Sequence, residues 1–103
     1  MMIKAVSGDP AGLLASIKRD IAQVVRTWLC DLEGDFSHEP AQFQNRAWLR
    51  PHIEAGVLRF SLIGPSGESM TMPLAGIYVG RFIEMLTAHF SNCISRIDAL
   101  VSA

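Results

Sequence analysis

Residues 57–74 read VLRFSLIGPSGESMTMPL. Apolar and polar residues alternate in both halves of this stretch, which is typical of strands because successive strand side chains point to opposite faces. Between the halves, Pro65 and Gly67 favour a tight turn. The stretch therefore predicts a β-hairpin with one apolar face, made of Leu58, Phe60, Leu62, Met70, Met72 and Leu74.

Residues 47–53 lie just before this hairpin and are rich in apolar and aromatic side chains, which favours a third strand. Pro51 places that strand at an edge of the sheet, because proline has no N–H for a hydrogen-bond ladder. Residues 54–56 end in Gly56 and supply the turn. The sequence thus predicts a three-stranded antiparallel meander over residues 47–74.

Two flanking stretches, residues 9–33 and 77–101, carry apolar residues at three- and four-residue spacing and predict long amphipathic helices. Asp9 is a favoured N-cap for the first helix, and residues 1–8 are interpreted as a tail or an edge segment. A three-stranded meander needs a cover for its apolar face. We therefore expect one two-layer α+β domain over residues 1–103, in the order α-β-β-β-α, with both helices on one face of the sheet.

The composition limits the classes of partner. Half of the 103 residues are apolar, the mean hydropathy is +0.26, and 18% of residues are charged, against about 25% in average soluble proteins. This scarcity of charge suggests that some apolar surface is covered by another chain. The formal net charge is -1 and the only lysines are Lys4 and Lys18, which makes nucleic acid an unlikely partner because phosphate binding needs clustered basic residues.

The same composition indicates where the protein works. No stretch reaches the roughly 18 uncharged apolar residues that a membrane span requires, so we expect no membrane association. Cys30 and Cys93 lie far apart and in no metal-binding spacing. A reduced, cytoplasmic protein is the simplest interpretation.

Two surfaces are candidates for a partner interface. The outer face of the predicted sheet combines tryptophan and arginine, which are enriched in protein interfaces, and the back of the predicted C-terminal helix carries small residues in place of charges. We therefore expect a non-catalytic protein-interaction module that forms a homodimer or larger oligomer and acts as an adaptor, a chaperone-like protein or an inhibitor. At the level of the fold alone, the α-β-β-β-α order resembles the first part of small secretion chaperones. The predicted interface residues are Trp48, Arg50, Arg59, Ile63, Met85, Ala88, Ser91, Asn92 and Ser95.

Two alternative functions are a small hydrolase-like or metal-binding protein and a weak nucleic-acid binder. The acidic and histidine-containing loop at residues 31–39 suggests a metal site or a small hydrolase, and His52 with Glu54 suggests a general base with its orienting carboxylate. A weak nucleic-acid binder would use the outer sheet face. Because no nucleophile, oxyanion donor or phosphate-binding loop accompanies these groups, we assign no catalytic, cofactor-binding or metal-binding residue and expect no cofactor.

Overall fold

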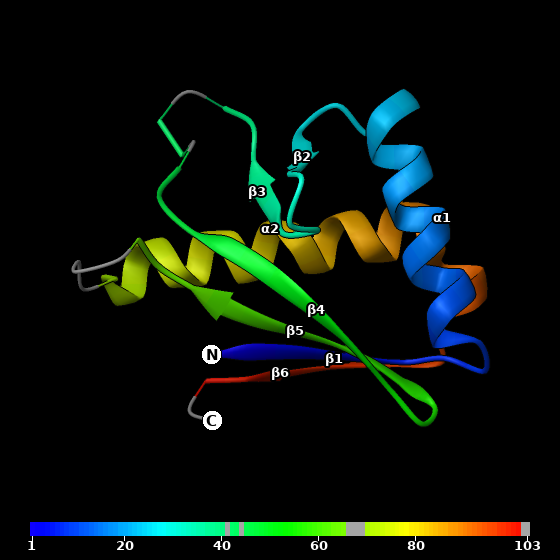
Figure 1. The fold of residues 1–103 in the computed structure, drawn as a ribbon. Coiled ribbons are helices and arrows are strands. Elements are labelled where there is room, and N and C mark those ends of the chain that lie inside the picture. The colour runs from blue at the N-terminus through cyan, green and yellow to red at the C-terminus, as the bar shows by residue number, and fades with distance from the viewer. Residues whose placement is uncertain (41, 44, 66–69, 102–103) are drawn as a thin grey trace.

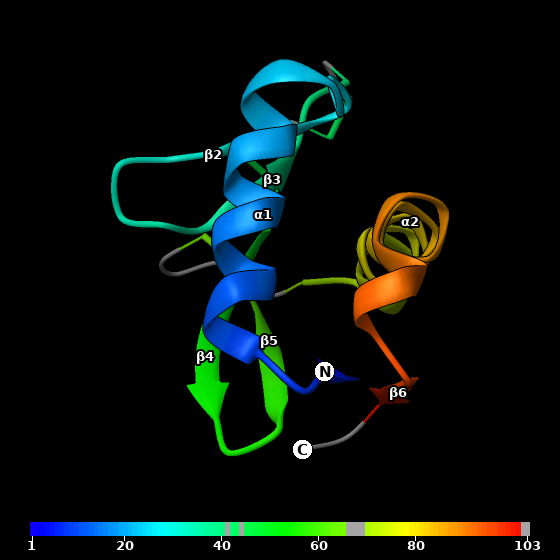
Figure 2. The same ribbon diagram turned by 90° about the vertical axis from the view of Figure 1, so that its right-hand side faces the viewer.

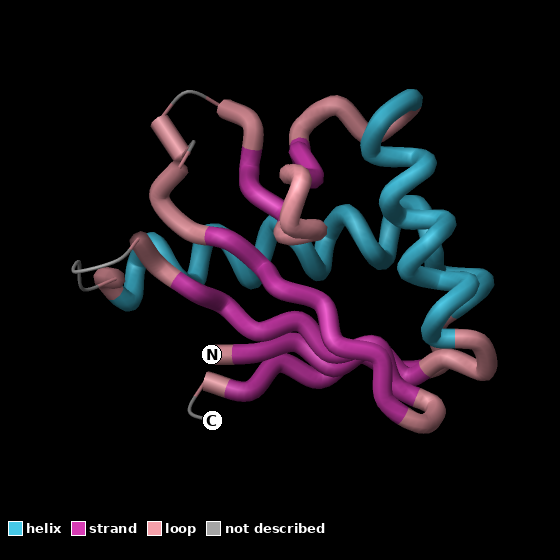
Figure 3. Tube along the Cα trace, in the orientation of Figure 1, coloured by secondary structure: helices cyan, strands magenta, loops and turns pink. Residues whose placement is uncertain are grey.

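The computed structural model describes residues 1–40, 42–43, 45–65 and 70–101. Figures 1 and 3 show an α+β fold in which helices pack beside one sheet. The described strands pair antiparallel throughout, and the described residues form two α-helices. The α+β class is confirmed, but the three-stranded meander is not, because the sheet has six strands in the order β2-β3-β4-β5-β1-β6. The elements are β1 (Met2–Val6), α1 (Pro10–Gln23), β2 (Trp28–Cys30), β3 (Phe36–His38), β4 (Trp48–Glu54), β5 (Val57–Ile63), α2 (Met72–Phe90), a 3-10 turn (Ser91–Cys93) and β6 (Arg96–Leu100).

The first part of the predicted meander is confirmed as the hairpin β4–β5. Glu54 pairs with Val57 across a two-residue turn in which Gly56 has a φ of 71°, a value that glycine adopts without strain. Strand β3 reaches β4 only at Leu49, through its pair with Phe36. Pro51 lies beyond that contact, so its missing N–H removes no bond to a neighbouring strand.

The return strand predicted at residues 70–74 is wrong. Helix α2 begins there instead, and its N-cap is Thr71, whose side chain accepts a hydrogen bond from the Leu74 N–H at 3.3 Å. Pro73 lies in the first turn, where proline is favoured because its missing N–H would have had no partner. The predicted turn at residues 64–67 falls partly outside the described residues.

Both chain ends were also predicted incorrectly. Residues 1–8 are neither a tail nor an edge, since β1 pairs with β5 on one side and β6 on the other. The helix predicted over 77–101 ends at Phe90, and residues 96–100 form the edge strand β6. Ser91 and Asn92 follow Phe90, and both residue types favour breaks because their side chains compete for backbone hydrogen bonds.

Helix α1 ends at Gln23 and not at residue 33, because the following residues build the hairpin β2–β3. The Asp31 carboxylate Oδ1 accepts hydrogen bonds from the backbone N–H groups of Glu33 and Asp35, both at 2.9 Å. Gly34 takes a φ of 86° in this turn. These contacts close the turn. They give a structural role to the acidic residues at 31–35, part of which the sequence pattern had assigned to the first helix.

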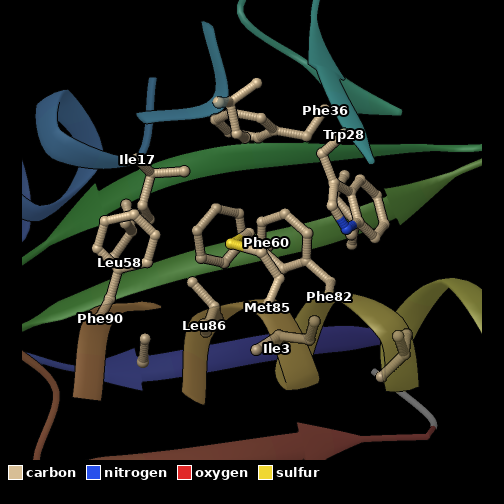
Figure 4. Close-up of a cluster of buried hydrophobic side chains, with 14 of the residues drawn as sticks. Ile3, Ile17, Trp28, Phe36, Leu58, Phe60, Phe82, Met85, Leu86 and Phe90 are labelled. Carbon is tan, nitrogen blue, oxygen red and sulfur yellow. The ribbon is translucent and has the colours of Figure 1, made fainter. Parts of the chain in front are cut away.

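Both helices lie on one side of the strands β4, β5, β1 and β6, as predicted and as Figure 2 shows. The core between them centres on Phe82, whose ring centroid lies 4.7 Å from that of Phe60 and 4.9 Å from that of Trp28 (Figure 4). Phe60, Phe82 and Leu86 are fully buried, as predicted from the hairpin and helix patterns. By contrast, Leu62 is only partly buried and Met72 is 58% exposed, because Met72 belongs to the first turn of α2.

Candidate interaction surface

The side of the sheet away from the helices is an open surface, which we call the outer face. Strand side chains alternate, so the neighbours of the fully buried Ile3, Leu58 and Phe60 point to this side. Within the described residues, neither helix covers it (Figure 2). The outer face consists of Met2, Lys4, Val6, Trp48, Arg50, His52, Glu54, Val57, Arg59, Ser61, Ile63, Arg96, Asp98 and Leu100.

Arginines on the outer face are paired with acids of the same face. Arg59 Nε donates to Glu54 at 3.1 Å, and Arg96 Nη2 donates to Asp98 at 2.9 Å. The hydrogen bonds that Arg96 donates to Asp98 raise the pKa of Arg96 above its ordinary value. These pairs neutralise Arg59 and Arg96, two of the four cationic residues of the face, which weakens its attraction for a nucleic-acid backbone.

At one end of the outer face, the β2–β3 turn and the start of β4 enclose a hollow of about 750 Å³, which we call the hairpin hollow. Its wall combines apolar side chains with three acidic residues and Arg50. Leu32 is at the tip of the turn and is fully exposed. The lining residues are Asp31, Leu32, Glu33, Asp35, Asn45, Trp48, Arg50, Ile63, Gly64 and Pro65.

A bidentate ion pair between Arg50 and Asp35 holds the polar side of the hairpin hollow in place. Arg50 donates from Nε to Asp35 Oδ1 at 3.0 Å and from Nη2 to Asp35 Oδ2 at 2.8 Å. Asp35 is 3% exposed, and its backbone is held by Asp31, whereas the Arg50 side chain is 46% exposed. Hydrogen bonding to Asp35 raises the pKa of Arg50. The hollow thus presents a cationic group whose orientation is set before anything binds.

The structure brings together four of the predicted interface residues. Trp48, Arg50 and Ile63 line the hairpin hollow, and Arg59 lies on the same face in β5. Trp48 and Ile63 are directly paired across β4 and β5. This grouping follows from the strand alternation that the sequence had predicted for residues 48–63.

The other five predicted interface residues do not share one helix face. Met85 is buried in the core, so it cannot be part of an accessible surface. Ala88 lines a separate small hollow between α2 and the β2–β3 hairpin. Ser91, Asn92 and Ser95 are exposed but follow the end of α2, because the chain leaves the helix at Phe90 to form β6.

The loop at residues 31–39 has a structural part in the fold. His38 is buried, and its ring stacks on Trp28 at 4.6 Å and on Phe43 at 5.4 Å between centroids. Its Nδ1 lies 2.8 Å from the Thr27 carbonyl oxygen, which can only accept, so Nδ1 carries the hydrogen. Within the described residues, no group of three His, Cys, Asp or Glu side chains is placed to hold a metal ion.

His52 and Glu54 occupy the same face of β4, as predicted, but Glu54 accepts its hydrogen bond from Arg59. The sequence interpretation did not identify the hairpin hollow, because it placed residues 31–33 in a helix. The spacing of Asp31, Gly34 and Asp35 is the signal that identifies the turn.

Comparison with known protein families, with curated proteins and with solved structures finds no match to the chain. Among the described residues, no helix is both long and apolar enough to span a membrane.

Proposed function

We propose that the protein is a non-catalytic interaction module that binds another protein through the outer face of its sheet, anchored in the hairpin hollow. It acts as an adaptor, a chaperone-like protein or an inhibitor. One observation carries this proposal: Trp48 and Arg50 lie side by side in a hollow on a sheet face that no described helix covers. The free thiols of Cys30 and Cys93 support a reducing, cytoplasmic setting.

Trp48 and Arg50 belong to the residue types that contribute most to binding at protein interfaces, typically about 2 kcal/mol or more per truncated side chain. Binding costs less when a side chain is already ordered, since less rotamer entropy is lost. Asp35 holds the Arg50 guanidinium through two hydrogen bonds. Arg50 is therefore ordered before a partner arrives.

The chemistry of the hollow indicates what a partner must present. Ile63, Pro65 and the exposed Leu32 offer contact to an apolar side chain. Asp31 and Glu33 are exposed on the rim and add negative charge around that contact. We therefore propose a partner segment with an apolar anchor next to a basic residue, because opposite charges at a rim favour the correct encounter.

Site-specific photo-crosslinking in extracts of the native cell tests this proposal. A photoreactive amino acid is placed at His52 or Ser61 on the outer face, and at Gly76 or Thr87 on the exposed side of α2 as matched controls. We expect the same discrete protein adduct, identified by mass spectrometry, from both outer-face positions and from neither control. Equal yields from the helix positions, or no adduct from the sheet positions, would reject the outer face as the binding surface.

A further inference from the structure

Among the described strands, β6 forms one edge of the sheet and pairs with β1 alone (Figures 1 and 2). The Ser7 N–H donates to the Gly56 oxygen, and the Leu62 N–H donates to the Met1 oxygen, each at 3.0 Å. Odd-numbered residues of β1 therefore bond toward β5, and even-numbered ones bond toward β6, because the two sides alternate in an antiparallel ladder.

The register then fixes which backbone groups of β6 face outward. Arg96 and Asp98 pair with the even-numbered Val6 and Lys4, so their N–H and C=O groups bond to β1. The N–H and C=O groups of Ile97 and Ala99 point to the free edge. This is a row of donors and acceptors of the kind that another strand can pair with.

The charged side chains of β6 are arranged so that two antiparallel copies of the strand place opposite charges next to each other. Arg96 and Asp98 have opposite charges and lie on the outer face, one on each side of Ile97 along the strand, while Ile97 itself lies on the core face. When two copies of the strand run antiparallel with Ile97 opposite Ile97, each Arg96 lies opposite the other copy's Asp98. A register centred on Asp98 would instead place two like charges opposite each other, which is destabilising.

We propose that a second copy of this chain pairs with β6 through an antiparallel two-fold contact centred on Ile97. The pair of Ile97 residues exchanges two backbone hydrogen bonds, and each Ala99 N–H adds one to the other copy's Ser95 carbonyl. The Ser95 N–H is already used within the chain, where it donates to the Val6 oxygen at 2.9 Å. The two Arg96–Asp98 pairs occupy the non-hydrogen-bonded positions, where side chains approach most closely.

This dimer extends the proposed function without depending on it. The two-fold axis runs perpendicular to the sheet, so the outer faces of both copies become one continuous surface with a hairpin hollow near each end. This proposal keeps the homodimer that we expected from the sequence and places its contact at a sheet edge instead of on the back of a helix. A partner presenting two binding segments would then bind more tightly than a partner presenting one.

Sedimentation of charge variants at about 100 μM, well above a micromolar dissociation constant, tests the contact and its register. The unmodified protein is expected to be a dimer. In Asp98→Arg, arginine would lie opposite arginine across the dimer contact, and in Arg96→Asp, aspartate would lie opposite aspartate. Because like charges repel, each variant alone is expected to be monomeric. An equimolar mixture of the two restores opposite charges at both positions and is expected to form a heterodimer.

Each result of this experiment has one meaning. A monomeric unmodified protein overturns the proposal, and so do dimers of both single variants. Failure of the mixture to associate, while both variants keep the unmodified circular-dichroism spectrum, refutes the register. The intrachain Arg96–Asp98 pair that both variants lose is exposed, so its loss does not threaten the fold.

Backbone substitution and amide exchange supply a second test. Ile97→Pro removes an outward N–H without removing a bond to β1 and is expected to give a folded monomer, whereas Ile97→Val keeps the N–H and the dimer. The amides of Ile97 and Ala99 should exchange slowly only at protein concentrations where the dimer is populated. The amides of Arg96 and Asp98, which bond to β1 within the chain, should exchange slowly at every concentration. A dimer that survives Ile97→Pro contradicts the contact. Trp48→Ala should leave the dimer intact, which separates this proposal from partner binding.

Discussion

Replacing Phe82 by alanine removes the ring at the centre of the core. Phe82 is fully buried and contacts three other aromatic rings, those of Trp28, Phe60 and Phe36, with centroids at 4.9, 4.7 and 5.7 Å. Such pairs contribute about 0.5–1.5 kcal/mol each beyond the apolar area that they bury. Deleting a core phenylalanine usually costs about 3–5 kcal/mol. Since a domain of this size has a free energy of unfolding of about 5–15 kcal/mol, the variant should be close to unfolding.

Thermal melts measure this loss. A cost of about 3 kcal/mol or more should lower the melting midpoint by at least about 12 °C, at roughly 4 °C per kcal/mol. Met72→Ala is the matched control, because Met72 is 58% exposed in the first turn of α2 and should cost less than about 0.5 kcal/mol. A loss at Met72 equal to that at Phe82 would refute the helix start and favour a return strand at residues 70–74.

Three further predictions follow from single residues. Thiol reagents should modify the exposed Cys93 before Cys30, whose pKa is raised by burial so that it holds less thiolate near pH 8; faster labelling of Cys30 would contradict its place in β2. Thr71→Ala should cost about 1 kcal/mol in urea unfolding through loss of the N-cap of α2, and Thr71→Ser should restore most of it; equal losses would reject the cap. Gly56→Ala should cost about 1–2 kcal/mol because Gly56 has a positive φ, whereas Gly76→Ala, in an open position of α2, should be neutral or stabilising; the opposite order would contradict the β4–β5 turn.

Local patterns predicted the β4–β5 hairpin and its faces correctly. The alternation around Phe60 distinguishes the buried from the outer side, and Gly56 specifies the turn. The same alternation gave the outer-face positions of Trp48, Arg50, Arg59 and Ile63. These features depend on residues that are neighbours in sequence, and so one sequence is sufficient to predict them.

The errors arose where two periodicities fit the same residues. In residues 24–33, Val25 and Trp28 fit a helical stripe and are buried, yet the turn closed by Asp31 makes this stretch a hairpin.

β1 and β6 lie at opposite ends of the chain and pair with each other. A short strand whose partner lies about 90 residues away gives no local signal of that pairing, so tertiary contact decided its structure.

The affinity of the partner recovered by crosslinking decides whether the hairpin hollow is its binding site. Calorimetric titration of that purified partner into the unmodified protein, Trp48→Ala and Ile77→Ala compares the hairpin hollow with an exposed apolar residue of α2. We expect Trp48→Ala to weaken binding about 30-fold, which corresponds to a loss of about 2 kcal/mol. Ile77→Ala should change the affinity less than about twofold. Binding that is unaffected by Trp48→Ala but lost with Ile77→Ala would place the partner on helix α2 and rule out the hairpin hollow as its site.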